Sequence, residues 1–116
     1  MSIVKRLFIG AAALVILLAT LSVTLFNKQS PHMSMTALMR EGRLEMRQHN
    51  YRQAVDTYRL AIAVDKRSVE AYLELAKACI LDGQLDDAEY FLRLGMEETN
   101  STKIRDAYND LLKPTN

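Results

Sequence analysis

The chain has 116 residues, of which 49% are apolar, and a formal net charge of +1. This length excludes a large two-domain enzyme, and the near-zero net charge argues against bulk nucleic-acid binding. The single cysteine, Cys79, excludes an intrachain disulfide and a cysteine-rich metal site. We therefore expect no cofactor, no metal and no nucleic-acid partner.

Residues 7–26 form an uncharged apolar run, LFIGAAALVILLATLSVTLF. At about 1.5 Å per residue a helix of this length spans about 30 Å, the thickness of the hydrocarbon core of a bilayer. The run predicts a transmembrane helix between a short N-terminal segment, 1–6, and a polar linker, 27–35. A cleaved signal peptide is the alternative, but the run is long for one and Ser22 and Thr24 make a poor cleavage site. We expect an uncleaved anchor.

The charges around this run predict its orientation. Lys5 and Arg6 precede it, which favours an N-terminus in the cytoplasm and the rest of the chain outside. The arrangement suits a single-pass protein of a bacterial inner membrane with its folded domain in the periplasm. A face of mostly small residues at helical spacing would let another helix approach closely, although lipid exposure is the alternative. That face consists of Gly10, Ala13, Leu17, Thr20 and Thr24.

From residue 36 the apolar pattern becomes helical and repeats after 34 residues, so that small residues fall on small and large on large. The matches are Leu38 with Tyr72, Met39 with Leu73, Gly42 with Ala76, Met46 with Ile80, Tyr51 with Leu85, Ala54 with Ala88, Tyr58 with Leu92, and Ala61 with Gly95. Breaks at His49-Asn50 and around Gly83 divide each unit into two helices. The predicted helices are 36–48, 51–65, 69–81, 85–98 and 103–112, within an all-α domain of residues 36–112 followed by a tail, 113–116.

This spacing resembles the tetratricopeptide repeat, with repeats at about 35–68 and 69–102 and residues 103–112 as the capping helix. The second unit matches better, at Tyr72, Leu75, Ala76, Gly83, Leu85, Ala88, Leu92 and Gly95. The first unit departs from the family pattern at Glu41 and Glu45, where large apolar residues are usual. The departure suggests that the first helix is less buried there or is covered by something else. The resemblance implies a protein that binds peptides or proteins and does no chemistry of its own.

In this family the first helix of each unit lines the concave face, which implies a partner-binding groove. Its candidate residues are Met39, Arg43, Met46, Arg47, Leu73, Lys77, Ile80 and Leu81. Because Arg43 and Lys77 are 34 residues apart, we expect two exposed cations side by side between apolar residues. The expected partner is an extended segment or an amphipathic helix with acidic groups. The alternative is that the apolar members, Met39, Met46, Ile80 and Leu81, are core residues.

Few side chains of the sequence could take part in a chemical reaction. His49 lies at a predicted turn with no acid-base partner identifiable by spacing, so we interpret it as a polar turn residue. Cys79 lies on an apolar helix, so we interpret it as a small buried residue. We expect a protein that is not an enzyme.

The charges divide unevenly between the units. Residues 35–68 carry seven basic and four acidic residues, and residues 69–102 carry two and eight. Charged side chains on solvent-exposed helix faces are a sufficient explanation for this uneven distribution. Alternatively, Arg47, Arg52, Arg59 and Arg67 steer an acidic partner, or two copies associate head to tail as a homo-oligomer.

Three functions fit these features. The first is a membrane-anchored adaptor or assembly factor that recruits or stabilises a protein partner at a membrane complex. The second is a permanent small accessory subunit of such a complex. The third is an organelle import receptor, whose cytosolic domain would reverse the topology.

Overall fold

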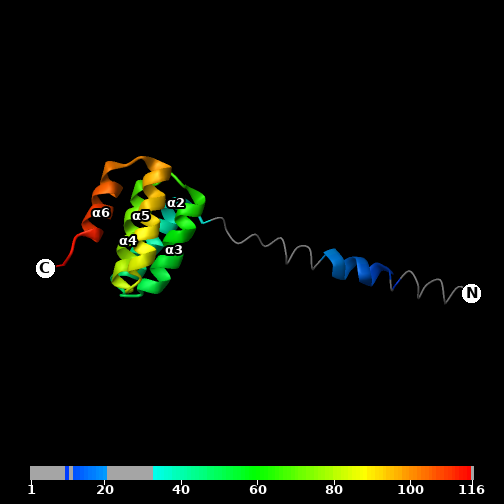
Figure 1. Cartoon of the computed structure of the whole chain (residues 1–116). Helices are drawn as coiled ribbons and strands as arrows, with labels where there is room; N and C mark the ends of the chain where they lie inside the picture. Colours follow the sequence, from blue (N-terminus) through cyan, green and yellow to red (C-terminus); the bar gives the residue numbers. More distant parts are fainter. Residues whose placement is uncertain (1–9, 11, 21–32, 116) are drawn as a thin grey trace, which may run out of the picture. The chain divides into compact units, whose positions relative to one another are not determined.

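The computed structural model describes residues 10, 12–20 and 33–115. The chain divides into an N-terminal part, 1–32, and a second part, 33–116, which contains both repeat units. Residues 33–115 form five helices and no strand: α2 (Met35–Arg47), α3 (Tyr51–Val64), α4 (Val69–Leu81), α5 (Leu85–Thr99) and α6 (Thr102–Leu112). Figure 1 shows α2 to α5 as neighbouring helices, with α6 following α5 and leading to the C-terminus. The prediction of an all-α repeat domain is confirmed for these residues, and each helix end lies within one residue of its expected position.

Serine residues begin the first helix of each unit and also α6. The side chain of Ser34 accepts a hydrogen bond from the Ala37 amide at 3.2 Å, and Ser68 accepts one from Ala71 at 3.2 Å. Ser101 caps α6 in the same way through the Ile104 amide. These bonds satisfy amide groups that have no partner within the helix. The start of α6 is therefore built like the start of a third unit.

The turns inside the two units share one hydrogen-bond pattern. His49 and Gly83 donate to Met46 and Ile80, and the residue after each donates to a carbonyl five positions back. Both turn residues have a positive φ, 60° for His49 and 77° for Gly83. This is the left-handed helix ending predicted for Gly83. In the first unit a histidine occupies the position that favours glycine.

Replacing His49 by glycine is expected to stabilise the domain by up to about 1 kcal/mol, because glycine adopts the left-handed conformation without the Cβ penalty. The variant loses an exposed hydrogen bond between His49 Nδ1 and the Tyr51 hydroxyl, which stabilises little in water. A shift of this size raises Tm by about 4–8 °C in a domain of this class, measured by circular dichroism. The reciprocal variant, Gly83→His, should lower Tm; an unchanged Tm in both would show that this conformation carries no strain.

The core is centred on α4, the helix with the most buried residues. Its buried side chains are Ala71, Tyr72, Leu75, Ala76, Ala78 and Cys79. Other helices contribute large side chains that are almost fully buried, namely Tyr58, Leu92 and Ile104. Two helical glycines make room for aromatic rings: a Cβ on Gly42 would lie 2.5 Å from the Tyr58 ring, and one on Gly95 2.8 Å from that of Tyr72. These glycines are therefore required by close packing.

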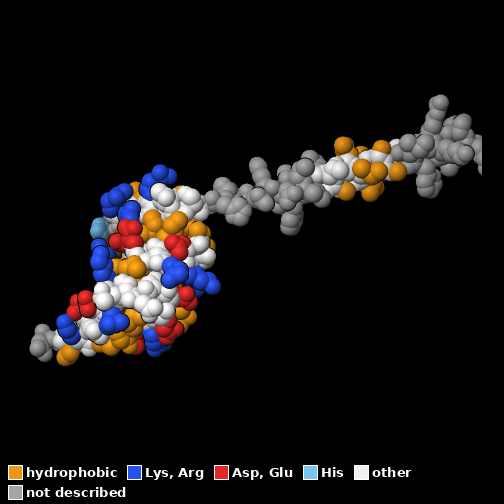
Figure 2. All heavy atoms as spheres, turned by 90° about the horizontal axis from the view of Figure 1, so that it is seen from above, with side chains coloured by type: hydrophobic (Ala, Val, Ile, Leu, Met, Phe, Trp, Pro, Cys, Tyr) orange, Lys and Arg blue, Asp and Glu red, His pale blue; other side chains and the backbone are white. Residues whose placement is uncertain are grey.

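The N-terminal part is described at residues 10 and 12–20, all of which are helical. Its large side chains, Leu14 to Leu18, have exposed fractions of 57–65%. Figure 2 shows them as a group of hydrophobic side chains. Within the described part of the chain, no helix combines the length and the hydropathy needed to cross a membrane. Much of the predicted span 7–26 lies outside the described residues, so that span stays a prediction.

The predicted packing face of this segment is described in part. Gly10, Ala13, Leu17 and Thr20 are exposed, and Thr24 lies outside the described residues. The Thr20 hydroxyl donates a hydrogen bond to the Leu17 carbonyl at 2.9 Å, which satisfies that hydroxyl within its own helix. This local bond is compatible with an apolar environment for the segment.

Candidate protein-binding surface

The candidate surface is formed by the first helices of the two units, α2 and α4, and we call it the first-helix face. Seven of the eight predicted groove residues are accessible on these helices. Arg43, Arg47, Lys77, Ile80 and Leu81 are exposed, and Met46 and Leu73 are half-buried. The exposed fractions of Ile80 and Leu81 are 42% and 47%, which is high for apolar side chains. These side chains are available to a partner.

Met39 is the exception among the eight. Its exposed fraction is 5% and it belongs to the hydrophobic core. The prediction that Met39 contacts a partner is therefore wrong, and the alternative interpretation as a core residue is right for this position. Helical spacing placed it beside Arg43, but the side chain lies on the part of α2 that packs inward.

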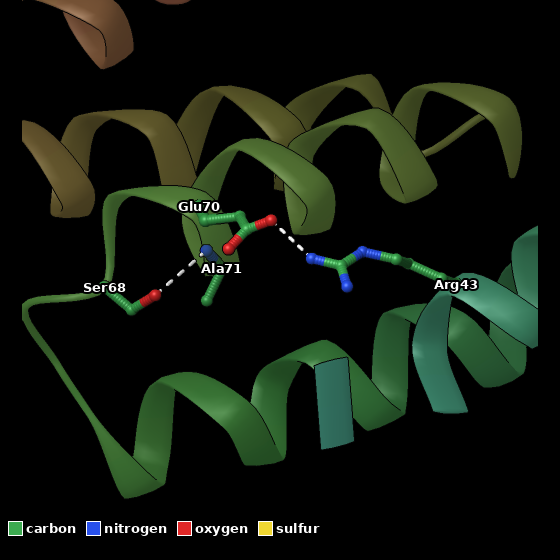
Figure 3. A network of polar contacts seen from close by, with 4 residues as sticks. All are labelled: Arg43, Ser68, Glu70 and Ala71. Carbon is green, nitrogen blue, oxygen red and sulfur yellow. Dashed lines mark hydrogen bonds and ion pairs between the residues drawn. The ribbon is translucent and has the colours of Figure 1, made fainter. Parts of the chain in front are cut away.

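Arg43 and Lys77, the two expected cations, are both exposed, but one of them has an ion-pair partner. The Arg43 guanidinium donates a hydrogen bond to the Glu70 carboxylate of α4, and Figure 3 shows this ion pair across the two helices. The Ser68 cap holds the first turn of α4, from which Glu70 extends. Within residues 33–115, Lys77 has no ion-pair partner. Of the two cations that the 34-residue spacing relates, Arg43 is thus paired and Lys77 is not.

Sequence comparison of the units missed this pair because the two residues are not equivalent positions. Arg43 lies near the middle of α2 and Glu70 in the first turn of α4. The available signal was that Glu70 and Lys77 are seven residues apart on one helix, and so share a face. The family resemblance likewise implies that Glu70 lies on the concave face, so only its pairing with Arg43 was not predicted.

A second group of residues that the sequence did not predict lies around the hydroxyl of Tyr58. The ring is fully buried, and Glu45 Oε2 is a buried atom with no hydrogen-bond partner. The pKa of Tyr58 is raised to about 12, first by burial and then by the Glu74 and Glu45 carboxylates and a hydrogen bond with Glu74, while Arg43 opposes them. We call Tyr58, Glu45 and Glu74 the polar seam. A buried polar atom without a partner costs about 1–3 kcal/mol, so this seam lowers the stability of the free domain.

The raised pKa values predict that the domain loses stability at alkaline pH. Tyr58 keeps its proton in the folded state up to about pH 12, and burial raises the pKa of Cys79 from 9.0 to about 11. In the unfolded chain these groups release their protons near pH 10 and 9. The contribution of these two groups to the free energy of unfolding is therefore complete below pH 9. It is lost as pH rises to about 12, by roughly 2 kcal/mol per group. Tyr58→Phe should move the alkaline unfolding midpoint upward in a circular-dichroism titration, and an unmoved midpoint would contradict this assignment.

Two of the four arginines proposed to steer a partner already have contacts. Arg52 pairs with Asp82 at 3.7 Å, and Arg59 lies over the Phe91 ring with 5.8 Å to its centroid. The first contact joins the start of α3 to the turn before α5, and the second joins α3 to α5. Both arginines therefore help to hold the two units together, which gives them a role apart from binding a partner.

The comparisons with known proteins agree with this architecture. The family model described as Tetratricopeptide repeat matches residues 45–111, more than half of the chain. A search of the curated proteins found no relative that matches. The matched region begins near the end of α2 and runs through α6. It therefore includes Tyr58 and Tyr72, the two tyrosines whose rings pack against Gly42 and Gly95. The chain belongs to the tetratricopeptide repeat family.

Proposed function

We propose that this protein is a membrane-anchored adaptor or assembly factor that binds a protein partner through the first-helix face and holds it at a membrane complex. The observation that carries the proposal is the accessibility of apolar and charged side chains on α2 and α4, with Ile80 and Leu81 about half exposed. Repeat domains of this family present such faces to peptides and proteins.

The anchor in this proposal is residues 7–26. Its support is the uncharged run in the sequence and the exposed apolar side chains of the helix at 12–20. An apolar helix exposed in this way is stable when lipid or another helix covers it. With Lys5 and Arg6 before the anchor, the proposed topology places the N-terminus in the cytoplasm and the repeats in the periplasm of a bacterium.

Two measurements test the anchor. The intact mass of the membrane-extracted protein should correspond to the full chain, because the segment is not removed. A mature N-terminus between Leu21 and Met35 would exclude an anchor. Reporter fusions at the C-terminus should show the periplasmic side, and a cytosolic result would favour the import-receptor alternative.

Affinity purification of the intact protein in mild detergent tests the adaptor role. We expect a protein partner that is recovered from wild type and is lost when Ile80 and Leu81 are both changed to serine. Leu60 and Val64, each 57% exposed on α3, provide a matched control pair away from the first-helix face. A partner lost only with the control pair would move the binding surface to α3. Stoichiometric recovery through detergent washes would favour the permanent-subunit alternative.

A further inference from the structure

The outer surfaces of α3 and α5, the second helices of the two units, carry exposed apolar side chains. Within residues 33–115, five large apolar side chains are at least half exposed, and four of them belong to these helices. The four are Leu60 and Val64 on α3, each 57% exposed, and Leu85 and Tyr90 on α5, with 55% and 50%. We call the outer surface of α3 and α5 the second-helix face. Apolar surface of this kind marks an interaction site.

The exposed residues of the second-helix face form a stripe along each helix, since side chains three or four positions apart lie on the same side of a helix. The stripe of α3 is Arg52, Asp56, Leu60 and Val64. The stripe of α5 is Asp86, Tyr90, Arg93 and Glu97, with Leu85 beside its first residue. Read from its start, the α3 stripe is therefore basic, acidic, apolar and apolar. Read from its end, the α5 stripe is acidic, basic and aromatic, and it finishes at Leu85 and Asp86.

These two stripes are complementary when they run in opposite directions. An antiparallel contact brings unlike charges together at two positions and apolar side chains together at two others. The opposed residues are Arg52 with Glu97, Asp56 with Arg93, Leu60 with Tyr90, and Val64 with Leu85. Within one copy α3 and α5 run in the same direction, because they are equivalent helices of successive units. The complementary contact therefore requires a second copy of the chain.

The total charges favour the same arrangement. Residues 51–68, which are α3 and the loop after it, carry four basic and two acidic residues, whereas α5 carries one basic and five acidic residues. Contact between the α5 helices of two copies would bring the acidic residues together and is disfavoured. Arg52 and Arg93 remain available for contact between α3 and α5. Both are more than half exposed, and their ion pairs within one copy measure 3.7 Å and 4.0 Å.

We propose that the second-helix face is the interface of a symmetrical homodimer, in which α3 of each copy lies antiparallel against α5 of the other. A two-fold axis between α3 and α5 forms the contact twice, because each residue pair then occurs in both directions. Tyr90 of one copy lies over an open depression of about 410 Å³ in the other, lined by Asp56, Arg59 and Leu60. Its ring packs on Leu60, and Asp56 offers an acceptor for its hydroxyl. The interface leaves the first-helix face free, so this inference goes beyond the proposed function and does not depend on it.

Native mass spectrometry of the full chain in detergent tests the interface. Wild type should be a dimer at micromolar concentration. Leu60→Ser/Val64→Ser removes the apolar contact of α3 and should raise the dimer dissociation constant roughly tenfold or more. Ile80→Ser/Leu81→Ser is the matched control on the first-helix face and should remain dimeric. All four positions are exposed, so circular dichroism should show unchanged helix content.

A charge exchange tests the direction of the contact. Arg52→Glu and, separately, Glu97→Arg make the opposed charges alike, so each variant alone should dimerise roughly tenfold more weakly. Mixed together, the two variants should form a heterodimer of wild-type affinity, since the opposed charges at these positions are again unlike. Arg47→Glu makes the same charge change at an exposed position of α2 and should leave dimerisation unaltered.

Three results would contradict this interface. A monomeric wild type, a dimer that tolerates Leu60→Ser/Val64→Ser, or charge variants that do not pair when mixed would each overturn the proposal. The adaptor role is measured separately, by recovery of a protein partner. Leu60→Ser/Val64→Ser should lose the dimer and still recover that partner, whereas Ile80→Ser/Leu81→Ser should keep the dimer and lose it.

Discussion

Truncation of the chain after Asn100 is expected to abolish stable folding of the repeat domain at 37 °C. The truncation removes α6, whose Ile104 is fully buried and lies close to Gly95 of α5. It also uncovers α4 and α5, both of which pack against α6. Loss of one large buried aliphatic side chain alone costs about 2–5 kcal/mol, and a domain of this size is stabilised by only about 4–12 kcal/mol. Repeat arrays need about three stacked units to bury a continuous core, and this chain has two units and α6.

Circular dichroism and limited proteolysis of the full chain and the truncated chain measure this effect. Deletion of residues 113–116 is the matched control, because these residues follow α6, and it should leave the melting curve unchanged. The single change Ile104→Ala should reproduce much of the loss. A truncated chain that melts at the wild-type temperature would show that α6 does not complete the core.

The sequence predicted the helices well because the signals for them are local. The repeat of small and large residues after 34 positions placed α2 to α5, and Gly83 marked a helix end that the structure confirms. The sequence also indicated where the first unit departs from its family, at Glu41 and Glu45. These are properties of one helix at a time.

The candidate surface was predicted less completely because it depends on contacts between helices. Spacing cannot say which side chain of α2 reaches across to α4, so the Arg43–Glu70 pair was missed and Met39 was assigned to the surface. It also cannot show that the hydroxyl of a core tyrosine ends beside two carboxylates. The repeat matched Tyr58 with Leu92 as a large residue, whereas the surroundings of its hydroxyl were visible only in three dimensions.

The change Gly42→Ala is expected to destabilise the domain by about 1–3 kcal/mol, although alanine is the better helix former. The added Cβ would lie 2.5 Å from Cε1 and 2.6 Å from Cζ of Tyr58. Since that ring is fully buried, it cannot move aside without disturbing its neighbours. The overpacking cost therefore exceeds the gain of up to about 1 kcal/mol in helix propensity.

The second unit shows how this loss can be repaired. At the positions equivalent to Gly42 and Tyr58 it has Ala76 and Leu92, a larger residue on the first helix and a smaller one on the second, and both are buried. Tyr58→Leu alone should cost roughly 1–3 kcal/mol, because it leaves space beside Gly42. The double variant Gly42→Ala/Tyr58→Leu should be more stable than the sum of the single changes predicts, by at least about 1 kcal/mol, because the new methyl group occupies space that the ring leaves. Urea unfolding of the four proteins in this cycle measures the coupling. Additive effects would mean that Gly42 and Tyr58 are not matched in size, and that the first unit contains glycine for a reason other than the tyrosine ring.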